Sequence, residues 1–349
     1  MRAICFEAHG NVDKLHLTEM DEPTLGPHDV LIRVRAASLN GFDPMILHGT
    51  TELKTPMPMI PGGDMAGEIV ALGERAHERD PRTPPFLGLF DPARWKVGDR
   101  VCPFPFVPGE GMTGETRRGS CCEYMAFPAM NLMPIPDDVS YEQAACVPIA
   151  YGTAYRLMCV VGKVRAREKV LILGATGGLG SCAVQLAKAA GAMVIATGRG
   201  AAKLEKLKAL GVDHVIDTGS EDFVAACHQI CGKPRMMSYD RGVDFVVNYI
   251  GGETWSQCQR VMKHGARMYT CGASAGFEAH TDLRYLWTYE HKLIGSNGWF
   301  PGDQLNLLAM VARGEITPLI DSVHPLEGTP KAMQKLIDRE VFGKVVIQA

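Results

Sequence analysis

The chain has 349 residues, 46% of them apolar, with 36 basic and 39 acidic side chains and a formal net charge of −3. At about 150 residues per domain, this length predicts two domains that each bury a sizeable core. A charge so close to zero gives no electrostatic reason to expect a nucleic-acid partner. The longest apolar runs, at 157–161 and 307–312, are far shorter than the ~20 residues that span a bilayer, so no membrane span is expected.

The N-terminus passes directly into strand-like sequence at Met1–Phe6, without the apolar core and small-residue cleavage site of a signal peptide. We therefore expect a cytoplasmic protein. The 11 cysteines are an odd number and are scattered through apolar patterns. This distribution favours reduced, buried thiols over a disulfide framework.

From residue 1 to about 149, short strand-like runs alternate with Gly and Pro turns. The predicted strands are residues 29–34, 67–72, 99–102 and 123–127. This spacing is typical of an all-β, barrel-like domain. A stretch rich in Pro, Arg and Asp at 77–95 interrupts the pattern and is predicted to be an exposed loop.

From about residue 168 the pattern changes to strands that alternate with helices. The predicted strands are residues 170–173, 193–196, 214–216, 243–247 and 267–271, with helices at 181–190 and 202–210. Continuous apolar runs indicate strands buried on both faces, and the alternation predicts an α/β fold with a doubly wound parallel sheet. The tail predicts helices at 304–313 and 331–338 and a last strand at 344–347.

A glycine-rich turn follows the first strand of this series. Ala175, Gly177 and Gly180 occupy the three small-residue positions of a dinucleotide-binding turn, which serve a tight turn, close approach of the pyrophosphate, and packing of helix on strand. Because backbone N–H groups at the helix start would face the pyrophosphate, the whole turn is expected to contact the cofactor. The predicted contacts are Ala175, Thr176, Gly177, Gly178, Leu179 and Gly180. A plain structural turn is the alternative, which the flanking strand and helix disfavour.

The end of the second strand favours NADPH over NAD. An acidic residue there would bind the adenine-ribose 2′-OH and repel a 2′-phosphate. This chain instead has Gly198, Arg199 and Lys203. Arg199 is the expected phosphate contact, and Lys203 is either a second contact or a solvated side chain. Further cofactor contacts are predicted at Thr153, Asn248, Tyr249, Cys271, Gly272, Ala273 and Asn297, several of which follow strands.

Several motifs in order resemble the medium-chain dehydrogenase/reductase superfamily. They are Asn-Gly-Phe-Asp at 40–43, Pro-Gly-Gly-Asp-Met-Ala-Gly-Glu at 61–68, Val-Gly-Asp-Arg-Val at 97–101, the turn at 174–181, Leu-Gly-Val-Asp-His-Val-Ile-Asp at 210–217 and Phe-Gly-Lys-Val-Val at 342–346. The resemblance implies a GroES-like β-barrel catalytic domain (1–150 and 293–349), a Rossmann NADPH-binding domain (151–292) and an active-site cleft between them. It also implies a homodimer or homotetramer.

The chain departs from the zinc alcohol dehydrogenases of that superfamily. Those enzymes have Cys, His and Cys ligands at the positions of Asn40, Gly63 and Ile149, and four closely spaced cysteines in the stretch that is 104–120 here. Since a catalytic zinc needs three protein donors, no metal site is expected. Cys146, three residues before the third position, is interpreted as a core thiol. The chain is in this respect similar to the zinc-independent quinone oxidoreductases and enoyl reductases.

Four polar residues are the candidate catalytic groups. Asn40 is expected to donate to the substrate or to the nicotinamide ribose, and Asp43 is a further candidate. Asp64 lies in a glycine-rich stretch and either fixes a turn there or faces the substrate. His48 either lines a surface or transfers a proton, a task to which imidazole is suited.

Three functions remain open at this level. The first is an NADPH-dependent reductase of quinones or of α,β-unsaturated carbonyl compounds, which would take a small-molecule substrate. The second is an alcohol or carbonyl dehydrogenase with a relocated metal site, and the third is a catalytically silent NADPH-binding protein. Thr51 stands where some enoyl reductases of the superfamily have a tyrosine acid, which disfavours a fatty-acyl enoyl reductase.

Overall fold

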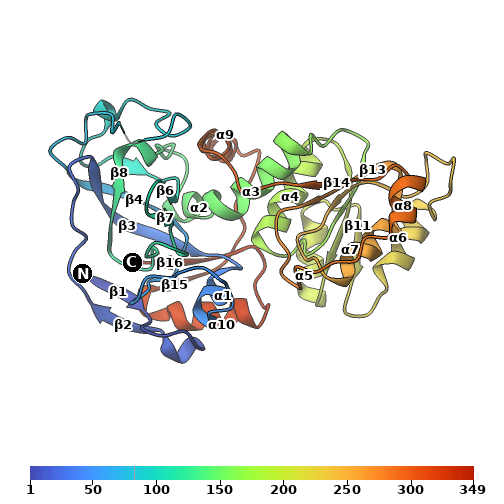
Figure 1. Cartoon of the computed structure of the whole chain (residues 1–349), viewed down its shortest axis with the longest axis horizontal. Helices are drawn as coiled ribbons and strands as arrows, with labels where there is room; N and C mark the ends of the chain where they lie inside the picture. The colour runs from blue at the N-terminus through green and yellow to red at the C-terminus, as the bar shows by residue number, and fades with distance from the viewer. Residues whose placement is uncertain (82) are drawn as a thin grey trace. The chain divides into compact units, whose positions relative to one another are not determined.

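The computed structural model describes residues 1–81 and 83–349 and divides into two compact units (Figure 1). Unit 1 comprises Met1–Gly152 and Phe300–Ala349, and unit 2 comprises Thr153–Trp299. Arg82, which falls in the predicted 77–95 loop, lies outside the described residues. Unit 1 is therefore assembled from both ends of the chain, with unit 2 inserted between them.

The second boundary differs from the expected one at 292/293. Strand β14 (Lys292–Gly295) pairs in parallel with β13 (Met262–Thr270), and Ile294 lies opposite Tyr269. Backbone pairing thus assigns β14 to the sheet of unit 2, and residues 293–299 go with it. The first boundary lies at 152/153 instead of 150/151.

Unit 1 is built on a six-stranded, mainly antiparallel sheet in the order β15-β16-β3-β4-β5, with β8 also paired to β3. Its strands are β3 (Asp29–Leu39), β4 (Asp64–Leu72), β5 (Arg100–Val101), β8 (Tyr124–Pro128), β15 (Ile320–Pro325) and β16 (Lys344–Gln348). Two short hairpins join β1 (Arg2–Cys5) to β2 (His16–Glu19) and β6 (Phe106–Val107) to β7 (Gly111–Met112). The strands predicted in this region are thus confirmed, with β3 longer than expected.

The long strand β3 organises the core of unit 1. Val30, Ile32 and Val34 alternate with more exposed residues, as expected of a strand with one buried face, whereas the last residues of β3 are buried without interruption. The helices of this unit are α1 (Asp43–His48), α2 (Tyr141–Ala145), α9 (Pro301–Ala312) and α10 (Thr329–Ile337). A π-helical turn at Val147–Tyr151 continues from α2. The buried end of β3 leads directly to Asn40.

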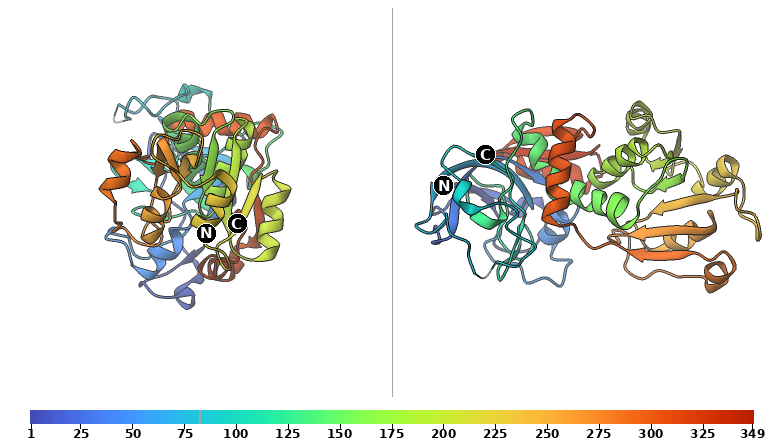
Figure 2. Two further views of the ribbon diagram at one scale, coloured as in Figure 1. Left: turned by 90° about the vertical axis from the view of Figure 1, so that its right-hand side faces the viewer. Right: turned by 90° about the horizontal axis from the view of Figure 1, so that it is seen from above.

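Unit 2 contains a six-stranded, fully parallel sheet in the order β11-β10-β9-β12-β13-β14. The remaining strands are β9 (Lys169–Ile172), β10 (Met193–Gly198), β11 (His214–Asp217) and β12 (Val243–Val247). The helices are α3 (Gly152–Tyr155), α4 (Gly178–Ala189), α5 (Ala201–Ala209), α6 (Phe223–Cys231), α7 (Glu253–Gln259) and α8 (Leu283–Thr288), and they flank the strands on both sides (Figure 2). This is the predicted doubly wound arrangement.

The strand order reverses between β9 and β12. From β9 the chain adds β10 and β11 on one side, and it then returns to add β12, β13 and β14 on the other. Open parallel sheets bind ligands beyond the carboxyl ends of the strands at such a reversal. In unit 2 this point carries the glycine-rich turn after β9. No helix of the described residues is long and apolar enough to cross a membrane.

Candidate functional site

Unit 1 holds the four candidate catalytic residues, and hydrogen bonds join three of them, Asn40, Asp43 and Asp64. Asn40 follows β3, Asp43 begins α1 and His48 ends it. Asp64 is the first residue of β4, a strand position instead of the expected turn, and lies opposite Ser38 in the β3–β4 pairing. Asn40, Asp43 and Asp64 are buried, whereas His48 is half-buried. The antiparallel register is what places Asp64 beside Asn40.

The Asp64 carboxylate is enclosed by donors. Its Oδ1 accepts from the Ile149 N–H at 2.9 Å, and its Oδ2 accepts from Asn40 Nδ2 at 2.9 Å and from Lys344 Nζ at 3.1 Å. The side chains of Asp64 and Lys344 are 0% and 2% exposed. Lys344 also donates to Asn40 Oδ1. Of the two roles weighed for Asp64, this geometry favours fixing the local structure, and it adds Lys344, which sequence reasoning missed.

The Asp43 carboxylate holds two backbone segments together. Its Oδ2 accepts from the Asn40 N–H at 2.6 Å, and its Oδ1 accepts from the Gly62 N–H at 2.7 Å. Burial raises the pKa of Asp43 to about 7, with the nearby Asp64 charge acting in the same direction against the two N–H donors and the Lys344 ammonium. A buried carboxyl that titrates near neutrality therefore supports the backbone of Asn40.

In unit 2 the glycine-rich turn joins β9 to the start of α4. Gly174 has a positive φ of 64°, so the tight turn falls on Gly174 and not on Ala175 as expected. A Cβ on Gly180 would lie 2.4 Å from the Gly174 carbonyl oxygen, whereas a Cβ on Gly177 would meet no atom closer than 3.8 Å. Gly180 is thus required by packing within the protein. Gly177 is thus not required by packing within the protein, and its position at the helix N-terminus fits close approach of a cofactor phosphate.

Tyr249 has a role in this turn that the sequence did not reveal. Its hydroxyl donates to the Gly174 carbonyl oxygen at 2.6 Å. Burial raises the pKa of this phenol, which therefore stays a neutral donor. The side chain from the loop after β12 thus fixes the turn after β9. Tyr249 was predicted only as a cofactor contact.

The other predicted cofactor contacts gather at the carboxyl edge of the parallel sheet. Gly198 ends β10 and is followed by the exposed Arg199, whose Nε lies 3.4 Å from Thr218 Oγ1. Lys203 lies in the first turn of α5. Asp217, opposite Gly198 on β11, accepts from the Gly219 N–H at 2.9 Å. The basic residues therefore stand at the edge where a ribose phosphate would lie.

Three further strand ends contribute to the same edge. Asn248 follows β12, and its Oδ1 accepts from the N–H groups of Ile250 and Gly251 at 3.1 and 3.0 Å, so its side chain shapes its own loop. The residues after β13 and β14 are Cys271, Gly272, Ala273 and Asn297. Thr153 lies instead in α3, at the beginning of unit 2. All sixteen predicted cofactor residues fall in unit 2, and all four candidate catalytic residues fall in unit 1.

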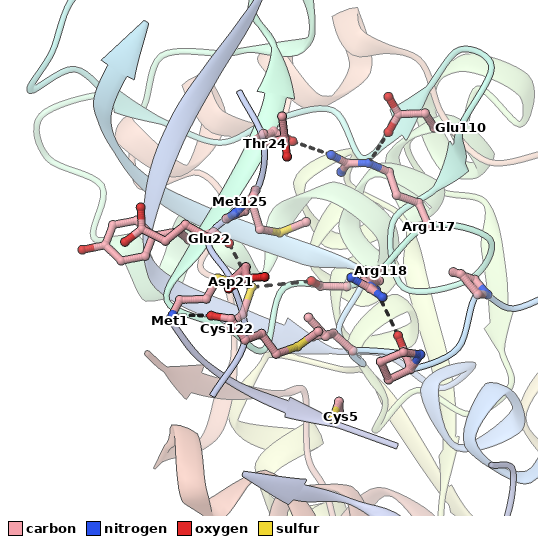
Figure 3. Close-up of a pocket in the computed structure, with 18 of the residues that line it drawn as sticks. Met1, Cys5, Asp21, Glu22, Thr24, Glu110, Arg117, Arg118, Cys122 and Met125 are labelled. Atoms are coloured by element: carbon pink, nitrogen blue, oxygen red, sulfur yellow. Dashed lines mark hydrogen bonds and ion pairs between the residues drawn. The ribbon is translucent and has the colours of Figure 1, made fainter. Parts of the chain in front are cut away.

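Unit 1 also contains a hollow of about 1190 Å³ (Figure 3). Its lining includes Met1, Cys5, Asp21 and Arg118, but none of the candidate catalytic residues. Arg118 Nε donates across it to the Pro58 carbonyl oxygen at 3.0 Å. The candidate site is the Asn40 cluster, which comprises Asn40, Asp43, Asp64 and Lys344, because it combines buried charge with the predicted motifs and the hollow does not.

Comparisons with known proteins agree with this geometry. Residues 26–137 match the alcohol dehydrogenase GroES-like domain, and residues 178–313 match the zinc-binding dehydrogenase family. The chain is 28% identical to the synaptic vesicle membrane protein VAT-1 homolog of Rattus norvegicus, over 99% of this chain and 84% of that protein. It is 26% identical to the quinone oxidoreductase of Homo sapiens, over 99% of this chain and 97% of that protein. The crystal structure of an NAD-dependent alcohol dehydrogenase superposes with a TM-score of 0.86 and 29% identity, over 100% of both chains.

The chain belongs to the medium-chain dehydrogenase/reductase superfamily. The expected GroES-like domain and parallel-sheet Rossmann domain are thereby confirmed. Membership makes the protein an oxidoreductase of this superfamily.

The zinc-ligand positions of this superfamily come together here but carry other side chains. Asn40 and the Ile149 N–H both bind Asp64, and Gly63 immediately precedes it. A Cβ on Gly63 would lie 2.4 Å from Ile149 Cδ1 and 2.8 Å from Phe42 Cζ, so the ends of two apolar side chains fill the space where a side chain at this position would begin. Among residues 1–81 and 83–349, no group of three or more His, Cys, Asp or Glu side chains could hold a metal ion. The residues at these positions do not fit a zinc ion.

The raised pKa of Asp43 predicts a pH-dependent stability. Because the folded protein holds this proton up to about pH 7 and the unfolded chain only to about 3.8, the native state binds more protons between these values. Relative to Asp43→Asn, the wild-type free energy of unfolding should fall by about 4 kcal/mol as the pH rises from about 3 to 8, and then level off. Urea unfolding of both proteins across this range measures the difference. A constant difference would contradict the assigned pKa.

Proposed function

We propose that the protein is an NADPH-dependent oxidoreductase that reduces a quinone or an α,β-unsaturated carbonyl compound by hydride transfer, without catalytic zinc. The packing at Gly63 carries this proposal, because Ile149 and Phe42 occupy the place of a zinc ligand. Without a Lewis acid, alcohol oxidation loses its means of stabilising an alkoxide. The similarity to a quinone oxidoreductase over nearly the whole of both chains also supports it.

The turn at Gly174–Gly180 and the start of α4 are the proposed phosphate-binding elements. A glycine that internal packing does not require, Gly177, and the N-terminal N–H groups of a 12-residue helix fit a pyrophosphate. Arg199 supports NADPH, because guanidinium pairs well with a 2′-phosphate and no acidic residue follows Gly198 directly. When bound, NADPH supplies the hydride.

The residues of unit 1 would orient the reactants. Asn40 is proposed to donate from its side-chain amide to the substrate or to the nicotinamide ribose. Asp43 and Asp64 then act as supports, since both carboxylates are occupied by donors from this cluster. A quinone needs no dedicated acid, because solvent can protonate the hydroquinone anion that hydride transfer leaves. His48 is a candidate proton donor for an activated alkene, because it is half-buried at the end of α1.

An alcohol or carbonyl dehydrogenase is the second candidate, favoured by the match to an alcohol dehydrogenase structure. A screen of NADPH oxidation against quinones, enals and enoyl thioesters, run with and without a chelator, separates the two. We expect turnover of at least one quinone or activated alkene, unchanged by chelator. Turnover that needs stoichiometric zinc would favour the second candidate. Binding of NADPH without turnover of any class would leave only a silent NADPH-binding protein.

The two glycines of the turn should separate binding from folding. Gly177→Ala adds a methyl group whose nearest protein atoms lie at 3.8 Å, an ordinary contact, so we expect an unchanged Tm and an NADPH affinity lowered about 10-fold or more. Gly180→Ala places a Cβ against the Gly174 carbonyl oxygen, so its Tm should fall. Fluorescence titration with NADPH and thermal unfolding measure these effects. Normal NADPH binding by Gly177→Ala would remove the turn from the proposed site.

Cofactor choice should depend on Arg199. Arg199→Glu replaces an attractive charge with a repulsive one at the proposed 2′-phosphate, so NADPH binding should weaken by about 10- to 100-fold while NADH binding changes little. Arg284→Glu, at another exposed arginine of unit 2, is the matched control. Titration of each variant with both cofactors measures the ratio. Equal weakening for NADPH and NADH would assign Arg199 no role in discrimination.

A further inference from the structure

The proposed chemistry leaves one buried charge without a task, the ammonium group of Lys344 at the start of β16. Lys344 is 2% exposed and contacts Asn40 Oδ1 and Asp64 Oδ2. We propose that Lys344 is a positioning residue, which locks the orientation of the Asn40 side-chain amide so that its N–H groups stay directed away from the ammonium. The inference rests on the proposed function, in which Asn40 contacts the substrate or the nicotinamide ribose.

Donor and acceptor chemistry allows the Asn40 amide one orientation in this network. A lysine ammonium can only donate, and an ionised carboxylate can only accept. Oδ1 must therefore face Lys344 and Nδ2 must face Asp64, as the structure shows. Rotation of the amide by 180° would set an NH₂ group against an ammonium. The second hydrogen on Nδ2 has no acceptor in this cluster, so it is the one available to a ligand.

A contribution to folding stability alone does not explain why Lys344 and Asp64 are buried as an ion pair. Removing two charges from water is costly, and apolar residues of similar volume often serve folding as well as a buried ion pair does. Asp64 also keeps the Ile149 N–H and Asn40 Nδ2 as donors when Lys344 is absent. Asn40 Oδ1, in contrast, loses the ammonium donor. Removal of Lys344 should therefore disturb the orientation of the Asn40 amide more than it disturbs Asp64.

A double-mutant cycle between Lys344 and Asn40 tests this role. Lys344→Met should lower kcat by about 10- to 100-fold in the wild-type background. In an Asn40→Ala background the same change should lower kcat by less than about 3-fold, because the group it positions is gone. Lys335→Met is the matched control, since Lys335 pairs with Asp321 at 2.6 Å elsewhere in unit 1, and its kcat should stay within about 2-fold. Equal losses in both backgrounds would overturn the proposal.

Two further variants guard against a folding defect. Asp64→Asn combined with Lys344→Met removes both buried charges together, so it should fold while still losing activity relative to Asp64→Asn alone. Lys344→Arg keeps a cationic donor and should recover part of the lost kcat. If the combined variant is folded and as active as Asp64→Asn, Lys344 does not position Asn40.

A readout that needs no turnover separates this inference from the proposed function. In an ¹⁵N-resolved NMR spectrum, the side-chain amide hydrogens of Asn40 should exchange with water at least about 10-fold faster in Lys344→Met than in the wild type. In Lys335→Met their exchange should be unchanged. Absence of turnover in the wild type would refute the proposed function only. An Asn40 amide unchanged by Lys344→Met would refute the positioning role, whatever the enzyme reduces.

Discussion

The ion pair between Lys344 and Asp64 is the interaction on which the rest of the candidate site depends. It joins β16 to β4 at a separation of 280 residues, and through Asn40 it also holds the end of β3. A carboxylate in this position would be untenable without donors, because an unpaired buried charge costs several kcal/mol. The Ile149 N–H supplies a further donor from the π-helical turn. Four distant segments of unit 1 therefore meet at one carboxylate.

The glycine-rich turn of unit 2 combines residues fixed by contacts within the protein with one residue that is not. Gly174 has a positive φ, and Gly180 packs closely against its carbonyl oxygen. The Tyr249 hydroxyl donates a hydrogen bond to the same oxygen. This part of the turn is determined by the protein itself and needs no ligand. Gly177 is different, because a Cβ at this position would make only ordinary contacts, at 3.8 Å. Contacts within the protein therefore fix Gly174, Gly180 and Tyr249 before any ligand binds, and Gly177 is the position at which a ligand can approach the backbone.

Sequence patterns predicted those features of the architecture that depend on residues close together in the chain. Continuous apolar runs marked the buried strands β9, β10 and β12, and the glycine-rich turn marked the β9–α4 junction. Asn40, Asp43 and Asp64 were found as candidates from their motifs. Lys344 was not, because its partners lie 280 and 304 residues away and only the pairing of β16 with β3 brings them together. The hydrogen bond from the Tyr249 hydroxyl to Gly174 was not predicted for the same reason. Strand β14 was missed because its apolar run is only two residues long.

The packing around Gly63 bears on how this site can change in evolution. A side chain at position 63 would meet the ends of the Ile149 and Phe42 side chains, which would have to move aside. The residues at 42, 63 and 149 therefore share one space, and the size acceptable at any one of them depends on the other two. A histidine at 63 is accommodated most easily when the residues at 42 and 149 are smaller, so gain or loss of a ligand at this position involves its neighbours as well.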